Sequence, residues 1–184
     1  MASVEVIDSV NATGSSYEIA FSGISGDFKH LELRGFLRSK SSTSTDPVHI
    51  LINGSTANYY MTGFNSGFNS SSGVWTFRDA SGATELGNNL GPNVLAASAS
   101  AGCHTQIEVW FGNYADSTTQ NAGIYKWYSG DNLSNSGLTL NPIGVAGWHC
   151  SDFTGAVTSI AVRTDNSSDH WTDTSWVTLY GWRG

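Results

Sequence analysis

The chain has 184 residues, and its 39% hydrophobic and 12% charged residues exclude an acidic disordered protein and predict one domain, residues 1–184, with a substantial core. Its formal net charge is −7 with only eight Lys and Arg, which argues against nucleic acid as a partner, because phosphate binding scales with the number of basic contacts. No run approaches the roughly 18 apolar residues of a membrane span, and no basic region precedes an apolar run at the N-terminus, so we expect no membrane partner and synthesis in a cytoplasm.

Two segments near the N-terminus show the alternation of apolar residues that is typical of β-strands. In residues 28–38 and 48–53 the apolar residues share one face of each segment: Leu31, Leu33 and Leu37, then Val48, Ile50 and Ile52. A polar, turn-forming loop joins the segments, so we expect them to pair as neighbouring strands. The charged residues of the first segment are expected to face water or a partner: Lys29, Glu32, Arg34 and Arg38. A sheet with one apolar face needs a second layer, which predicts a sandwich.

The segment 54–102 is rich in glycine and is expected to be loop-rich, because it holds one compact apolar run, residues 74–77. A structureless connection of that length would be unusual, so we predict one hairpin or edge strand near Trp75, flanked by long loops. The segment also carries aromatic residues among Asn, Ser and Gly: Tyr59, Tyr60, Phe64, Phe68 and Trp75. These rings either pin the loops to the sandwich or form an adaptable contact surface.

Further strands are predicted over residues 4–10, 17–21, 104–111, 122–128, 138–149, 156–163 and 175–180. Residues 122–128 carry large side chains on both faces, so this strand either lies between two layers or displays one face to another subunit. Pro142 predicts an edge strand or a bulge. No segment has a helical period over three turns. The predicted fold class is all-β, an antiparallel β-sandwich or jelly roll of about nine or ten strands with long loops.

The sequence contains no nucleophile elbow, zinc-protease motif or phosphate-binding loop, so we expect neither an enzyme nor a cofactor. Its two cysteines each stand beside a histidine, in Cys103-His104 and His149-Cys150. Adjacent residues of a strand point to opposite faces, so these pairs are poor ligands for one tetrahedral ion, and no metal is expected. A cross-strand disulfide and two unlinked thiols are both open alternatives.

Carboxylates give two further hypotheses. Asp165, Ser167 and Asp169 alternate as oxygen ligands do at the start of a calcium loop, but the glycine and the bidentate glutamate of that pattern are missing. A solvated hairpin loop is the simpler interpretation. A glycosidase needs two facing carboxylates, and Glu108 beside Trp110 is the acid with an apolar neighbourhood in the sequence.

A series of short motifs follows in order along residues 17–181. The first is the segment Phe21 to Ser39, and the others are Ile52-Asn53-Gly54, Asn58-Tyr59, Ile107-Glu108-Val109, Asn113-Tyr114, Ala146-Gly147-Trp148, residues 159–162 and Leu179-Tyr180-Gly181. Together these motifs resemble a recurring β-domain of tailed-bacteriophage virion proteins. Each motif is short, and their order carries the resemblance.

The resemblance implies a virion protein that is assembled in the host cytoplasm. The chain starts at its own methionine without an upstream coiled coil, which favours a capsid decoration or cement protein that stabilises the shell through oligomeric contacts. The implied partners are the major capsid protein or tail components, and further copies of the chain in a homo-oligomer such as a trimer. The alternatives are a tail, baseplate or head-fibre component that binds a host-surface glycan, and a carbohydrate-binding module.

Tryptophan is enriched at the energetic centres of protein interfaces, which nominates contact residues for such a partner. The candidates are Trp75, Trp148, Trp171 and Trp182, together with Trp176. Ordinary core packing is the alternative for Trp148 and Trp176.

Overall fold

The computed structural model describes residues 3–56, 58–66, 74–87, 92–129, 143–151 and 155–184. These residues form strands and no helix: β1 (Ser3–Asn11), β2 (Glu18–Ser22), β3 (His30–Leu37), β4 (Thr45–Ile52), β5 (Tyr59–Ser66), β6 (Val74–Ala83), β7 (Asn93–Leu95), β8 (Thr105–Gly112), β9 (Ala122–Ser129), β10 (Ile143–Cys150), β11 (Ser159–Thr164) and β12 (Trp176–Arg183). The described chain therefore offers no helix with the length and hydropathy needed to cross a bilayer. The all-β class is confirmed, with more strands than expected.

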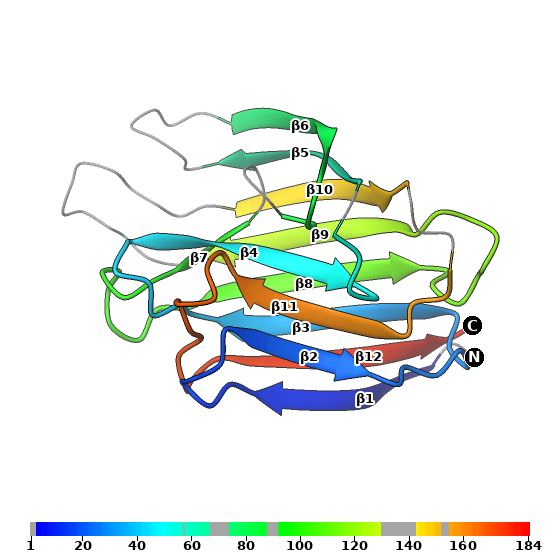
Figure 1. Cartoon of the computed structure of the whole chain (residues 1–184), viewed down its shortest axis with the longest axis horizontal. Helices are drawn as coiled ribbons and strands as arrows, with labels where there is room; N and C mark the ends of the chain where they lie inside the picture. Colours follow the sequence, from blue (N-terminus) through cyan, green and yellow to red (C-terminus); the bar gives the residue numbers. More distant parts are fainter. Residues whose placement is uncertain (1–2, 57, 67–73, 88–91, 130–142, 152–154) are drawn as a thin grey trace.

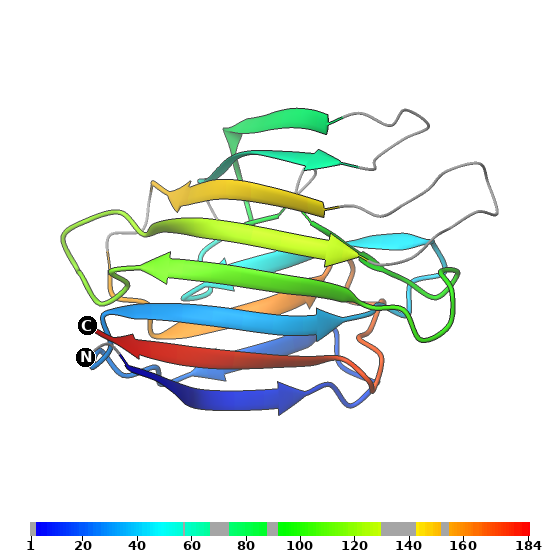
Figure 2. The ribbon, with the colours of Figure 1, turned by 180° about the vertical axis from the view of Figure 1, so that it is seen from behind.

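Two antiparallel sheets face each other (Figures 1 and 2). The large sheet has eight strands in the order β1-β12-β3-β8-β9-β10-β5-β6, and the small sheet has four in the order β2-β11-β4-β7. The small sheet is in front in Figure 1 and the large sheet is in front in Figure 2. Both views show the two marked chain ends side by side, as the pairing of β1 with β12 requires. The predicted β-sandwich is confirmed.

The core lies between the sheets, because one face of each strand is apolar. The predicted inward residues of β3 and β4 are fully buried: Leu31, Leu33, Leu37, Val48, Ile50 and Ile52. In β8, Ile107, Val109 and Phe111 are also buried, while the residues between them are more exposed. One contiguous cluster of buried side chains includes residues of both sheets. Alternation in the sequence therefore identified the buried face of these strands correctly.

β3 and β4 do not pair with each other, which corrects the expectation drawn from their adjacency in sequence. β3 pairs with β12 and β8, whereas β4 pairs with β11 and β7, so the two strands lie in opposite sheets. The polar loop between them is a connection from one layer to the other. Alternation alone could not distinguish the two arrangements, because both bury the same apolar residues.

Arg38 was expected to face water or a partner, but it is only 9% exposed. Its guanidinium group donates hydrogen bonds to the carbonyl oxygens of Ala99, Ser100 and Cys103, at 2.7 to 2.9 Å. A buried guanidinium is tolerated here because main-chain acceptors satisfy its donors. Arg38 therefore fastens the loop that leads into β8.

Within the described residues, the glycine-rich segment 54–102 contains a hairpin, which was one of the two alternatives predicted near Trp75, and a further short strand. β5 and β6 form a hairpin with β6 at the edge of the large sheet, which confirms a strand near Trp75, and the short β7 pairs with β4. Gly63 interrupts the alternation of β5, which hid this strand in the sequence. A Cβ atom at Gly63 would overlap the main chain of β10, so this close approach requires glycine.

The edge or bulge expected from Pro142 falls outside the described residues. β10, which begins at Ile143, has β9 on one side and β5 on the other, so it is not an edge strand. This central position is important for the site, because β10 runs beneath both pockets described below.

Candidate functional site

The outer face of the large sheet, which is turned away from the small sheet, displays many large apolar side chains. Among the described residues, eight of them are more than a third exposed: Val4, Val6, Phe36, Phe64, Ile124, Tyr128, Ile143 and Trp176. Apolar side chains that gather on a surface among polar groups often mark an interaction site. β9 does not lie between two layers, because one side of the strand is buried and the other is exposed.

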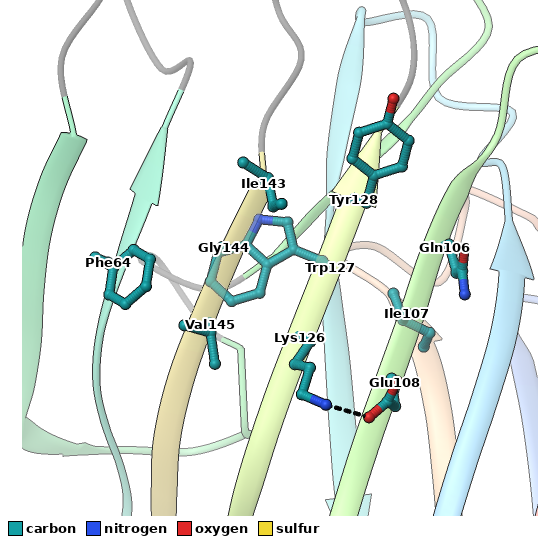
Figure 3. A pocket seen from close by; sticks show the side chains of 10 residues that line it. All are labelled: Phe64, Gln106, Ile107, Glu108, Lys126, Trp127, Tyr128, Ile143, Gly144 and Val145. Carbon is teal, nitrogen blue, oxygen red and sulfur yellow. Dashed lines mark hydrogen bonds and ion pairs between the residues drawn. The ribbon is translucent and has the colours of Figure 1, made fainter.

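A pocket of about 360 Å³, here called the first pocket, opens on this face across β5, β10, β9 and β8 (Figure 3). Strand register places its wall residues in two transverse rows: Phe64, Val145, Lys126 and Glu108 in one, and Ile143, Tyr128 and Gln106 in the next. Three buried residues complete the lining: Ile107, Trp127 and Gly144. Because the rows are set by backbone pairing, the pocket is part of the sheet rather than of a loop.

The polar wall of the first pocket is an ion pair between neighbouring strands. Lys126 Nζ lies 2.5 Å from Glu108 Oε1, and Figure 3 shows the two side chains reaching toward each other. Both side chains are partly exposed, so the pair adds little to stability, but its remaining donors and acceptors can bind a polar ligand. Glu108 is the single carboxylate among the described residues lining this pocket, so the two facing acids of a glycosidase do not occur there.

A second pocket of about 400 Å³ lies toward the other end of β5, β10 and β9, and it extends to β6. Its lining consists of Tyr60, Thr62, Arg78, Ala122, Gly123, Gly147, Trp148 and His149. The imidazole of His149 stacks on the ring of Tyr60, with centroids 4.8 Å apart and planes 7° apart. Gly147 leaves the centre of this pocket open, because a Cβ atom there would have its nearest neighbour at 4.0 Å.

An aromatic cluster occupies the outer face of β12, β3 and β8. Trp110 lies between Trp182 and His30, with ring centroids 5.5 and 5.2 Å away. Beside it, Glu32 accepts hydrogen bonds from Trp182 Nε1 at 3.0 Å and from Arg34 Nε at 2.7 Å. Glu32 is therefore only 2% exposed, which corrects the expectation that it faces water. The hydrogen bond from Arg34 to Glu32 raises the pKa of the Arg34 guanidinium.

The candidate tryptophans divide into three groups. Trp171 is fully buried, and Trp148 is 3% exposed and packs edge-on against Phe111, so neither indole is available as the predicted partner contact. Both indoles pack in the core between the sheets, and Trp148 also contributes to the lining of the second pocket. Trp182 and Trp176 lie on the outer face and stay candidates. Trp75 lies in β6, where it pairs with Asn65 of β5, and its side chain falls outside the described part of the structure.

Several residues that line the two pockets were named from the sequence for other reasons: Tyr60, Phe64, Ile107, Glu108, Gly147, Trp148 and His149. The other lining residues were missed. Among the missed residues are Tyr128 and Lys126 of β9 and Arg78 of β6. The signal that could have found Tyr128 was the set of large side chains on both faces of residues 122–128. Arg78 carried no comparable signal, because its neighbours come from distant parts of the chain.

The structure also shows where the residues of the metal and disulfide hypotheses lie. β8 begins just after Cys103 and β10 ends at Cys150, and strand register puts these points at opposite ends of the large sheet. Neither cysteine is in a disulfide. Asp165 lies 3.6 Å from His49 Nε2, and Asn166 donates a hydrogen bond to Asp165. Within the described residues, no group of three or more His, Cys, Asp or Glu side chains is arranged to hold a metal ion.

No protein-family model and no curated protein matches the sequence. Among solved structures, the galectin LEC-6 of Caenorhabditis elegans is 13% identical over 92% of this chain and 94% of its own, with a TM-score of 0.36. A toad ovary galectin in complex with thio-digalactose is 12% identical, with coverage of 80% and 99% and a TM-score of 0.27. A PL-14 alginate lyase from Aplysia kurodai is 7% identical, with coverage of 86% and 70% and a TM-score of 0.26. These TM-scores lie below 0.5, so we infer the function from this chain's own residues and not from these structures.

Proposed function

We propose that the protein is a non-enzymatic binding module that holds a saccharide in the first pocket. The observation that carries the proposal is the composition of this pocket. The exposed apolar side chains of Phe64, Tyr128 and Ile143 stand beside the Lys126–Glu108 ion pair. A ligand that fits presents apolar surface together with groups that donate and accept hydrogen bonds.

A sugar ring has both properties. Its C–H faces pack on aromatic and aliphatic side chains, while its hydroxyl groups exchange hydrogen bonds with charged and amide side chains. The ammonium group of Lys126, the carboxylate of Glu108 and the amide of Gln106 supply those partners from adjacent strands. Hydrogen bonds between sugar hydroxyl groups and Lys126 or Glu108 are charge-assisted, which makes them stronger than those to Gln106. The sheet holds the groups in place before binding, which reduces the entropy that is lost on association.

Titration with a panel of neutral oligosaccharides, followed by calorimetry and by tryptophan fluorescence, tests this proposal. Trp127 lines the pocket, so a bound sugar is expected to change its emission. Tyr128→Ala should weaken binding about tenfold or more, because it removes the most exposed aromatic ring of the first pocket. Ile124→Ala is the matched control, since Ile124 lies on the same strand and face but outside both pockets. Equal losses for the two variants, or no binding to any sugar, would contradict the proposal.

A second candidate is the virion role, as a capsid decoration protein or a tail appendage that carries such a module. It rests on the order of the phage-like motifs, and one structural feature favours it. The edge strand β1 exposes Val4 and Val6, at 48% and 59%, which suits contact with a neighbouring subunit or a further copy of the chain.

Copurification with virus particles and sedimentation equilibrium of the isolated protein test the virion role. A decoration protein should be present in stoichiometric copy number and raise the melting temperature of empty shells, whereas an appendage should be present in few copies. Val4→Lys together with Val6→Lys should weaken the contact without altering sugar binding. A monomer that is absent from particles would contradict this second candidate.

A further inference from the structure

We infer that the second pocket binds an anionic group, a carboxylate or a sulfate, and that the saccharide proposed above is therefore acidic. The inference builds on the proposed function, because it assigns the charge of the same ligand. It starts from the residues of the second pocket, which include two that can carry positive charge, Arg78 and His149. No acidic side chain is among the described residues that line it.

Arg78 differs from the other arginines of the chain. Arg34, Arg163 and Arg183 each pair with a glutamate, and Arg38 donates to three carbonyl oxygens. Arg78 is exposed and has neither kind of partner in the described part of the structure. In a protein with a net charge of −7, an unpaired arginine that faces a pocket is a distinctive feature. Its planar guanidinium matches the geometry of a carboxylate or a sulfate.

The neighbours of Arg78 complete a site for an anion. Arg78 pairs with Thr62 in strand register, and Thr62 pairs with Gly147, so the guanidinium, a hydroxyl and an open glycine form one row. The next row holds Tyr60 and His149, whose stacked rings fix the imidazole at the rim. An anion above Gly147 thus has a guanidinium, a hydroxyl and an imidazole N–H around it.

The two pockets suit one ligand, because β5, β10 and β9 contribute to both. Along β10 the first pocket uses Ile143 and Val145, and the second uses Gly147 and His149. Four residues of a strand span about 13 Å, which is the length of a short oligosaccharide. A chain of sugars along β10 can therefore place one unit on Tyr128 and an acidic unit beside Arg78.

Paired glycan probes test the inference. Oligogalacturonates are compared with their carboxyl-reduced forms, and sulfated dextran oligosaccharides are compared with unsulfated ones, by calorimetry. We expect at least one acidic member to bind about tenfold tighter than its neutral counterpart, with an affinity that falls as salt increases. The carboxylate and sulfate arms show which anion the pocket prefers. Equal affinity within both pairs, or no binding of any acidic member, would overturn the inference.

Arg78→Gln should abolish the preference for the acidic member and leave the neutral member bound as before. Arg183→Gln is the matched control, because it removes the same charge from an exposed position of the same sheet. Gly147→Val should also remove the preference, by filling the second pocket. An equal loss of preference for the acidic glycan in the Arg183 variant would contradict the inference.

Failure of the proposed function gives a different result. In that case no neutral sugar binds and Tyr128→Ala has no effect, but the sulfated probes still lose affinity in Arg78→Gln, which supports an anion site alone.

Discussion

Gly144 of β10 leaves the space that the indole of Trp127 occupies on the neighbouring strand β9. A Cβ atom at Gly144 would overlap the six-membered ring of that indole. Figure 3 shows the ring beside Gly144, at the floor of the first pocket. The pair explains how the large ring of Trp127 fits beneath the pocket without disturbing the pairing of β9 with β10.

Gly144→Ala is therefore expected to lower the free energy of unfolding by about 1–3 kcal/mol, because the indole must leave its position. Chemical denaturation measures the change. Gly147→Ala is the control on the same strand, where the added methyl group meets open space. It should leave stability unchanged or raise it by about 0.5–1 kcal/mol, since glycine is unfavourable in a strand interior. Similar destabilisation by both changes would show that Gly144 is not needed to make room for Trp127.

Glu32→Gln should destabilise the protein by about 1–3 kcal/mol, because the buried carboxylate accepts hydrogen bonds from Arg34 and Trp182. The amide keeps one oxygen acceptor but removes the charge that faces Arg34. Thermal and chemical unfolding measure the loss, and near-ultraviolet circular dichroism reports on Trp182. Glu108→Gln is the comparison, because Glu108 is in a more exposed ion pair and should change stability by less than about 1 kcal/mol.

Asn53→Ala should cost about 2–4 kcal/mol. Asn53 has a positive φ of 51°, which is unfavourable for alanine, and its side chain makes short hydrogen bonds to three main-chain groups. Asn53 Oδ1 accepts from the N–H groups of Thr158 and Ser159 at 2.8 and 2.9 Å, and Nδ2 donates to the carbonyl oxygen of Ala156 at 2.8 Å. Asn53→Gly, which relieves the strain, should recover part of the loss. A neutral effect of both changes in denaturation would contradict this account.

Alkaline conditions should destabilise the fold through buried tyrosines. Burial raises the pKa of Tyr59 from 10.0 to about 12, and burial also raises the pKa of Tyr125. The unfolded chain then loses these protons first, so stability is retained below about pH 10 and falls as the pH rises toward 12. Each such tyrosine contributes a slope of about 1.4 kcal/mol per pH unit.

Tyr59→Phe isolates one of these contributions. It removes the hydrogen bond that the Tyr59 hydroxyl accepts from the Ile52 N–H at 2.9 Å, which lowers stability at every pH. It should also make the fall in stability above about pH 10 less steep. Denaturation at a series of pH values measures the slope, and ultraviolet absorbance follows phenolate formation. An unchanged slope would show that Tyr59 titrates alike in both states.

The motifs behind the phage resemblance have clear structural roles. Asn58 and Asn113 both have positive φ, and each precedes a buried tyrosine. The hydroxyl group of Tyr114 bonds to the main chain of Ser25 and Phe28, which are far away in the sequence, whereas the hydroxyl group of Tyr59 accepts a hydrogen bond from the N–H of the nearby Ile52. The Asn58-Tyr59 and Asn113-Tyr114 motifs therefore fix corners of the sandwich. The virion role is a proposal that the particle experiments test.

The sequence by itself determined the all-β class and the buried faces of strands such as β3, β4 and β8, because side-chain alternation is a local pattern that does not depend on the partner strand. The sequence could not show that β3 and β4 lie in opposite sheets, that Glu32 is buried beneath Trp182, or that Arg78 of β6 and His149 of β10 line the same pocket. The tertiary structure decided these, since strand pairing joins residues that are far apart in sequence. Both pockets exist because register across four strands lines up side chains that no segment carries together.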